Sequence, residues 1–134
     1  MTKIILTLLL LLLTTNLNAL SVKRVTRVYD GDTITVDLSC RTKIFCKNIG
    51  IRIRGIDTPE IRDKRPHIKK KAYKARDYVR NRIKSAKHME LRNLSRGKYF
   101  RVIAEVWLDG YNLGEEMIDK GLAKAYLGGK KEQW

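Results

Sequence analysis

Apolar and polar residues alternate with a period of two along much of the chain, a pattern typical of strands that bury one face. The alternation is clearest over residues 49–54, where isoleucines occupy one side and Arg52 and Arg54 the other. Similar runs of strand-favouring residues occupy four further segments: 22–28, 33–38, 88–94 and 100–108. The sequence therefore predicts five strands.

Two segments have the spacing of amphipathic helices instead. The longer one begins after Pro66 and reaches about Lys87, and apolar residues recur in it every three or four positions. These residues form one stripe: Ala72, Ala75, Val79, Ile83 and Ala86. The shorter helix follows Asn112, which can cap it, with Glu115 at the capping-box position, and it stops near Gly121.

Five strands, one helix inserted between the third and the fourth, and a short helix near the end predict a mainly β fold, a closed five-stranded barrel of the OB type. The turn signals agree with this order. Asp30-Gly31 predicts a hairpin, Pro59 ends the third strand, and Ser95-Arg96-Gly97 predicts the turn between the last two strands. After the short helix, Gly128-Gly129-Lys130-Lys131 predicts a flexible tail.

The N-terminus has the features of a secretory signal peptide. Lys3 precedes an apolar run over residues 4–13, and Asn18-Ala19 lies where a cleavage site belongs. The run is shorter than the roughly 20 residues that a membrane-spanning helix needs, although a permanent single-span anchor remains the alternative. We therefore expect a signal peptide over residues 1–19, one domain over 20–134, no stable membrane insertion after cleavage, and a secreted or periplasmic protein.

The chain is strongly basic, and this changes the expected partner. Lys and Arg number 29 against 14 Asp and Glu, which gives a net charge of +15. Such a charge favours a polyanionic partner, most often nucleic acid. On charge alone, an anionic membrane surface or a polysaccharide is an equally compatible partner. Much of the charge lies on the predicted long helix, either as solvated surface or in contact with phosphates.

Cys40 and Cys46 are the two cysteines of the chain and lie between two predicted strands. In an oxidising compartment we expect them to form a disulfide that closes a hairpin loop, with free buried thiols as the alternative. Two cysteines without a histidine motif argue against a zinc site.

Acidic residues are scarce, yet two short clusters stand beside strands: Asp30-Gly31-Asp32-Thr33 and Asp57-Thr58-Pro59-Glu60. The second cluster follows Arg52 and Arg54. Carboxylates bind hard cations, and arginine binds phosphate through paired hydrogen bonds. Acids placed beside arginines on strands therefore indicate a site that holds a cation and a phosphate together, which points to phosphodiester chemistry.

These residues, in this order, resemble the staphylococcal nuclease family, also called thermonuclease or micrococcal nuclease. The resemblance spans nearly all of the chain after the signal peptide. Asp-Gly-Asp alone is common in turns, but four motifs in the right order are far more specific. The matching motifs are residues 28–33 (VYDGDT), 52–60 (RIRGIDTPE), 97–101 (GKYFR) and 121–126 (GLAKAY).

The resemblance implies a calcium ion bound by the carboxylates of Asp32 and Asp57 and by the backbone carbonyl of Thr58. Asp30 matches an acid that acts on the ion through water, although an aspartate before a glycine is equally common as a plain turn residue. A calcium ion accepts oxygen ligands in loose geometry, which suits this donor set.

The resemblance also implies that Arg52 and Arg101 hold the scissile phosphate and that Glu60 is the general base. Glu60 either accepts a proton from water or orients that water, with a structural surface acid as the alternative. Three further residues match positions that hold the neighbouring nucleotide, with ordinary barrel-rim aromatics as the alternative for the tyrosines: Lys98, Tyr99 and Tyr126.

We therefore expect a monomeric, exported, calcium-dependent nuclease that hydrolyses DNA and RNA with little sequence preference and leaves 3′-phosphate ends. One alternative is an OB module that binds nucleic acid without cleaving it, and another is a cationic surface protein without enzymatic activity. Two departures from the family pattern stand out. Phe100 replaces a small residue before Arg101, and the longer C-terminal helix of the best-known member has no counterpart, so we expect Trp134 to fold back in its place.

Overall fold

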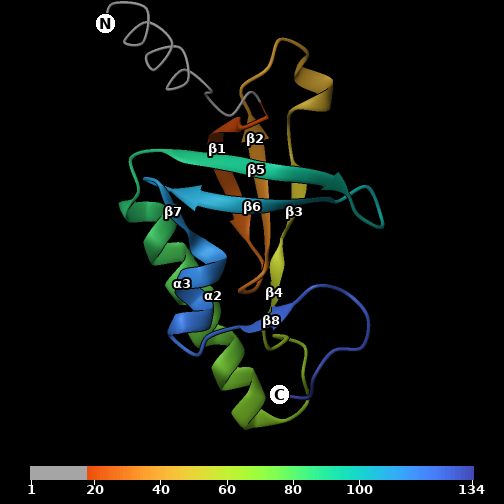
Figure 1. Cartoon of the computed structure of the whole chain (residues 1–134), viewed down its shortest axis with the longest axis vertical. Coiled ribbons are helices and arrows are strands. Elements are labelled where there is room, and N and C mark those ends of the chain that lie inside the picture. The colour runs from red at the N-terminus through yellow and green to blue at the C-terminus, as the bar shows by residue number, and fades with distance from the viewer. Residues whose placement is uncertain (1–17) are drawn as a thin grey trace, which may run out of the picture.

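The structure, a computed structural model, describes residues 18–134, and a closed β-barrel forms its centre (Figure 1). Five strands build the barrel: β1 (Leu20–Val28), β2 (Thr33–Leu38), β3 (Ile49–Ile53), β5 (Met89–Arg96) and β6 (Val102–Leu108). Neighbouring strands pair antiparallel in the order β3-β2-β1-β5-β6. A parallel pairing of β3 with β6 closes the sheet, with Ile51 opposite Val102 and Ile53 opposite Ala104. The predicted OB-type barrel is confirmed.

Within residues 18–134, two α-helices, a short 3₁₀ helix and three short strands complete the fold. Helix α2 (Pro66–Ser85) lies between β4 (Gly55–Asp57) and β5, and α3 (Leu113–Asp119) follows β7 (Tyr111–Asn112). The capping prediction for α3 is confirmed, because the Asn112 side chain accepts hydrogen bonds from the backbone N–H groups of Gly114 and Glu115. Strand β4 pairs with β8 (Lys124–Tyr126) outside the barrel.

The core lies inside the barrel and continues beneath α2. Alternate residues of β2, β3 and β6 are fully buried, as the period of two predicted. From α2 the buried side chains are Ile68, Ala72, Ala75 and Val79, whereas Ile83 and Ala86 are half-buried. The small alanines allow α2 to pack close to the barrel at the β1–β2 turn.

The turn between β5 and β6 differs from the prediction. Ser95 and Arg96 pair with β6 rather than forming the turn, which lies after Gly97. The polar residues that suggested a turn instead mark an irregularity in the strand pairing between Arg92 and Ser95, where Asn93 has φ 51°. A bulge and a turn use the same residue types, so composition alone does not separate them.

The departure at Phe100 has a conformational consequence. Tyr99 and Phe100 have φ values of 56° and 60° in the β5–β6 turn, and the Phe100 side chain is exposed. This left-handed backbone suits glycine and is unfavourable for a large side chain. A glycine in place of Phe100 would therefore relieve strain immediately before Arg101.

The two cysteines are joined by a disulfide in the structure. Their Cα atoms lie 6.2 Å apart, and the bond closes the loop around a short 3₁₀ helix at Lys43–Phe45. The expected bridge over this hairpin loop is therefore present.

The expected signal peptide lies almost wholly outside the described residues. Between residues 18 and 134, no helix is both long enough and apolar enough to cross a membrane. Strand β1 begins at Leu20, directly after the predicted cleavage position.

Candidate active site

The tight turn between β1 and β2 places the first acidic cluster. The backbone N–H of Tyr29 donates to the carbonyl of Thr33 at 3.0 Å and closes the turn. Gly31 sits at its tip with no space for a side chain, since a Cβ there would lie 2.8 Å from Thr58 Cγ2 and 2.9 Å from Ala75 Cβ. Glycine is thus required for close packing, and this packing holds the turn against α2 and the β4 end.

Asp32 leaves this turn with its carboxylate buried and oriented. Its Oδ2 accepts a 2.9 Å hydrogen bond from the backbone N–H of Thr58, and its Oδ1 accepts one of 3.0 Å from the Thr33 hydroxyl. Only 2 % of the residue is exposed. A carboxylate held by a backbone donor from a distant segment is preorganised, because it has little freedom to rotate.

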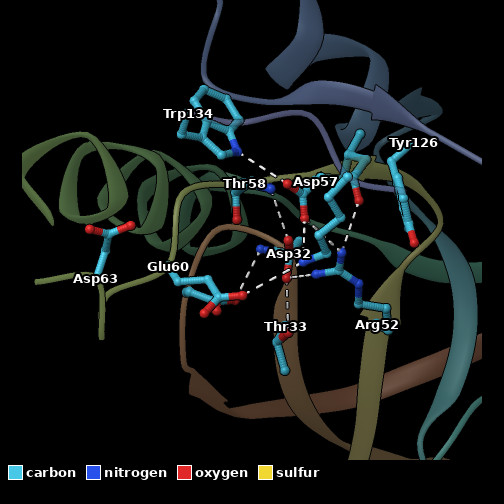
Figure 2. A network of polar contacts seen from close by, with 12 residues as sticks. Asp32, Thr33, Arg52, Asp57, Thr58, Glu60, Asp63, Tyr126 and Trp134 are labelled. Atoms are coloured by element: carbon cyan, nitrogen blue, oxygen red, sulfur yellow. Dashed lines mark hydrogen bonds and ion pairs between the residues drawn. The ribbon is translucent and has the colours of Figure 1, made fainter. Parts of the chain in front are cut away.

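Arg52 connects the two acidic clusters (Figure 2). Its guanidinium forms an ion pair with Asp32 Oδ1 through Nη1, and its Nη2 lies 3.3 Å from Asp57 Oδ1. The same Nη2 donates to the Ile56 carbonyl at 3.2 Å. Because β3 pairs with β2, with Arg52 opposite Thr33, the arginine lies beside Asp32 by strand register alone.

Asp57 ends β4 and is also buried, with 4 % of the residue exposed. Besides Arg52, its Oδ1 contacts Lys131 Nζ at 2.7 Å, and its Oδ2 accepts a 3.1 Å hydrogen bond from Trp134 Nε1. Burial acts to raise the pKa of Asp57, but the hydrogen bonds from Lys131 and Trp134 and the charge of Arg52 outweigh it. The pKa of Asp57 is therefore lowered, and the group is a carboxylate at neutral pH.

The donor set around the two aspartates fits a hard cation. All candidate ligands are oxygens, namely the carboxylates of Asp32 and Asp57 and the carbonyl of Thr58. The Thr58 hydroxyl is a buried polar atom without a hydrogen-bond partner among the described residues. Within residues 18–134, no group of three or more acidic, histidine or cysteine side chains forms a ready-made metal site. A cation here would thus take its remaining ligands from water or substrate, as calcium does.

Asp30 lies next to this set. It is 8 % exposed, and its Oδ1 accepts a 3.3 Å hydrogen bond from the backbone N–H of Asp32. Burial raises the pKa of Asp30, and the hydrogen bonds of Thr33 and the charge of Arg52 offset this only in part. Asp30 therefore acts as a structural turn residue, and it also lines the same cavity as Asp32.

A cavity of about 610 Å³ opens beside the aspartates. Six of the predicted site residues line it: Asp32, Arg52, Glu60, Lys98, Arg101 and Tyr126. They come from separate parts of the chain that the barrel and the β4–β8 pair bring together. Asp57 and Thr58 join them through their contacts with Arg52 and Asp32.

Arg101 reaches the cavity because it immediately precedes β6, which pairs in parallel with β3. Its side chain passes over Gly50, where a Cβ would lie 3.3 Å from Arg101 Cγ. The two predicted phosphate-binding arginines, one on β3 and one immediately before β6, thus line one cavity.

Glu60 and Tyr99 occupy more exposed positions. The Glu60 side chain is 68 % exposed at the cavity, and its Oε1 lies 3.6 Å from Lys131 Nζ. It is therefore open to water. Tyr99 does not line the cavity, and it is exposed on the β5–β6 turn next to Lys98.

Sequence reasoning missed one residue of this site altogether. Lys131 belongs to the segment predicted to be flexible, yet it contacts both Asp57 and Glu60 and lines the cavity. A glycine pair before lysines carries no signal for such a contact. Trp134 was expected to fold back, and it does so onto Asp57.

Comparisons with known proteins agree with this geometry. The family model described as "Staphylococcal nuclease homologue" matches residues 50–133. A protein named "Thermonuclease" from Staphylococcus hyicus is 30 % identical over 103 residues, which are 76 % of this chain and 57 % of that protein. An "Uncharacterized endonuclease" from Haemophilus influenzae (strain ATCC 51907 / DSM 11121 / KW20 / Rd) is 34 % identical over 128 residues, 92 % of this chain and 65 % of that protein.

The aligned part of this chain spans less than two thirds of the length of each of these relatives. The family model nevertheless covers more than half of the chain, including β3, β4 and the residues from Arg52 to Lys131 that surround the cavity. The chain belongs to the staphylococcal nuclease family.

Proposed function

We propose that the protein is a calcium-dependent nuclease that hydrolyses phosphodiester bonds of DNA and RNA with little sequence preference. One observation carries this proposal. Arg52 bridges two buried carboxylates at the wall of a cavity that Arg101 also lines. A cation site and two forked phosphate donors in one cavity are what phosphodiester hydrolysis requires.

The two arginines would act on the charge of the reacting phosphate. Negative charge builds on the equatorial oxygens as water attacks phosphorus, and donors already aimed at that position stabilise it. Ion pairs with Asp32 and Asp57 hold Arg52 at the cavity wall, directly beside the carboxylates that would bind the cation. Its planar guanidinium can donate two parallel hydrogen bonds, which lysine cannot.

Asp32, Asp57 and the Thr58 carbonyl would hold the calcium ion, which when bound adds positive charge beside the phosphate. Glu60 would take the proton from the attacking water or orient that water. Attack forms a new P–O bond to the water oxygen and breaks the bond to the 5′ oxygen. That oxygen takes up a proton from solvent and leaves as a 5′ hydroxyl, so the phosphate remains on the 3′ end. The exposed position of Glu60 at the cavity is compatible with access to water.

The remaining cavity residues support broad substrate use. Lys98 offers a cation to a neighbouring phosphate, and the ring of Tyr126 offers a stacking face. Every nucleotide carries a phosphate and a base with a π-face, so such contacts do not read sequence. The net charge of +15 strengthens binding to any nucleic acid.

We also propose that the protein is exported. The apolar N-terminal run supports this, and so does the Cys40–Cys46 disulfide, since such bonds persist in oxidising compartments. All described strands and helices begin at or after Leu20, so removal of residues 1–19 would leave them intact. Expression with and without residues 1–19, followed by fractionation, tests this proposal, and equal retention of both forms inside the cell would contradict it.

The main test is digestion of plasmid DNA and of a structured RNA by the protein from residue 20 onward, with calcium or with a chelator. We expect cleavage only with calcium, 3′-phosphate ends by end-labelling, and strong loss of activity in Arg52→Ala and Glu60→Ala. Binding of nucleic acid without calcium-dependent cleavage would favour the binding module instead. Absence of both binding and cleavage would favour a cationic surface protein.

A further inference from the structure

The C-terminal segment over residues 127–134, called the tail below, returns to the site and is held there at several points. The Tyr126 hydroxyl donates to the Gly129 carbonyl at 3.0 Å, and Lys124 Nζ donates to the Gln133 carbonyl at 2.5 Å. From the other side, Arg65 Nη1 donates to the Trp134 carbonyl at 3.1 Å. The chain end consequently lies near the start of α2, close to the β4–β8 pair (Figure 1).

These contacts fix the indole of Trp134 beside Asp57. The ammonium of Lys124 lies 4.9 Å from the centroid of the Trp134 ring, and Lys124 is paired with Asp57 across β4 and β8. Trp134 Nε1 then donates to Asp57 Oδ2 at 3.1 Å, as Figure 2 shows. An indole N–H is a neutral donor with one direction, so this bond is sensitive to the rotation of the carboxylate.

The two oxygens of Asp57 have different partners. Oδ1 faces the cationic groups, with Lys131 Nζ at 2.7 Å and Arg52 Nη2 at 3.3 Å. Oδ2 is turned away from them and accepts the bond from Trp134. The terminal torsion of an aspartate is broad, so contacts on both oxygens are needed to hold the carboxylate plane in one orientation. The Trp134 bond supplies the contact on the second oxygen and so fixes that plane, with the first oxygen toward the cationic groups.

We propose that Trp134 is a positioning residue that holds Asp57 Oδ1 toward the cation site. The inference rests on the proposed function, because it assigns Trp134 a part in calcium binding. Partners that orient metal ligands typically contribute about tenfold to a hundredfold in metal affinity or activity. Loss of the indole N–H should weaken calcium binding by a similar factor while the fold stays intact.

The chain contains a matched control for this bond. Trp107 on β6 donates through its Nε1 to Glu105 Oε2 at 2.9 Å, and Arg92 lies 4.2 Å from its ring centroid. Both tryptophans thus combine a carboxylate acceptor with a cation over the ring, but the acceptor of Trp107 is Glu105, which is not a candidate metal ligand. Trp134→Phe and Trp107→Phe remove the same group from equivalent settings, and only the first touches the candidate metal ligand.

The experiment compares the protein with Trp134→Phe and Trp107→Phe by calorimetric titration with calcium, with thermal unfolding in chelator alongside. We expect calcium binding to be about tenfold to a hundredfold weaker in Trp134→Phe. Affinity should be unchanged in Trp107→Phe. Equal affinity in all three proteins, or equal weakening in both variants, would overturn the inference while leaving the proposed nuclease function intact. Lack of calcium binding in the unmodified protein would instead overturn both.

A second readout does not require altering Trp134. In Trp107→Phe the only tryptophan left is Trp134, so its fluorescence reports directly on its contact with Asp57. We expect the emission to change with calcium, with the same midpoint as in calorimetry. If Trp134→Phe fails to fold, this titration decides the question, and emission that stays constant through calcium saturation would refute the role.

Discussion

Two basic regions of this protein hold their charges in opposite ways. In the site, Arg52 is 17 % exposed in its side chain and lies between two buried carboxylates. On the outer face of α2, five lysines are exposed and form no ion pair within residues 18–134: Lys69, Lys70, Lys71, Lys74 and Lys84. The first arrangement fixes a charge at one point, and the second spreads charge over a surface.

The difference suggests different tasks. A fixed guanidinium stabilises charge on a phosphate bound at one position, so its contribution to the reaction rate depends on geometry. An exposed ammonium acts by attracting phosphates and releasing counterions, and its value depends on salt. We therefore expect changes in the site to alter the rate of cleavage, and changes on α2 to alter the affinity and its salt dependence.

The largest effect is expected for Arg52→Lys. Lysine keeps the positive charge but cannot donate two parallel hydrogen bonds to phosphate. The turnover rate should therefore fall by about a hundredfold to a thousandfold. Cleavage of DNA at saturating substrate measures this. Arg24→Lys is the matched control, because Arg24 also pairs with an aspartate, Asp37 at 2.5 Å, but does not line the cavity. Loss of less than tenfold in Arg52→Lys would show that fixed geometry is not what distinguishes the site.

A smaller effect is expected for the triple variant Lys70→Gln, Lys74→Gln and Lys84→Gln. If these lysines contact phosphates, affinity for long duplex DNA should fall about tenfold at low salt. The slope of log affinity against log salt concentration should become shallower by about 2.7, or about 0.9 for each lost phosphate contact. The turnover rate at saturation should not change.

The control for α2 changes the same number of charges elsewhere. Lys23, Lys47 and Lys87 are exposed and lie outside both α2 and the cavity. Glutamine at all three should have less effect than the α2 variant. If the salt dependence of DNA affinity were identical for the two triple variants, DNA binding would depend on net charge and not on the surface of α2.

Unlike the five lysines, Arg82 of α2 is paired with an acid on another helix, and it sharpens the comparison. Its Nε and Nη2 donate to the two oxygens of Glu116 on α3 at 2.8 and 2.9 Å. The hydrogen bonds from Arg82 lower the pKa of Glu116 below the ordinary value of 4.5, against the effect of burial. The folded pKa is below the unfolded one, so this stabilisation is present above pH 4.5 and is lost as pH falls through the folded pKa.

We therefore expect Glu116→Gln to reduce the free energy of unfolding by about 1 kcal/mol at pH 7. The difference in free energy of unfolding between the variant and the unmodified protein should become smaller as the pH falls below 4.5. Denaturant unfolding at pH 7 and at acid pH measures both. Glu115→Gln serves as control, because Glu115 is exposed and has no ion pair among the described residues. If this difference became larger at acid pH, the result would contradict a stabilising ion pair between Arg82 and Glu116.

The smallest effect is expected for Lys131→Gln. Lys131 Nζ lies 2.7 Å from Asp57 Oδ1 and would compete with a cation at that oxygen. The lysine is 44 % exposed, so solvent screening limits its effect to about 1 kcal/mol, or roughly fivefold. Half-maximal cleavage should need up to about fivefold less calcium, whereas Lys130→Gln should behave as the unmodified protein. A higher calcium requirement would indicate that Lys131 assists binding instead.

Local patterns accounted for the elements and for most of the site. Alternation identified the strands around Ile51 and Ile53, and helical spacing identified α2 from Pro66 onward. The two acidic clusters lay where these patterns ended, and strand register then placed Arg52 beside Asp32. These features depend on neighbours within a few residues or on one strand pairing, so the sequence contains the information directly.

The sequence by itself thus determined the barrel and the residue types of a cation and phosphate site. Only the tertiary structure decided that Ser95 continues β5 past a bulge, that Tyr99 lies outside the cavity, and that Lys131 and Trp134 meet Asp57. The tail has no periodicity of its own, and its position results from single contacts with residues up to 77 positions away in the chain. Such contacts depend on where the whole barrel places Asp57, and no local pattern encodes them.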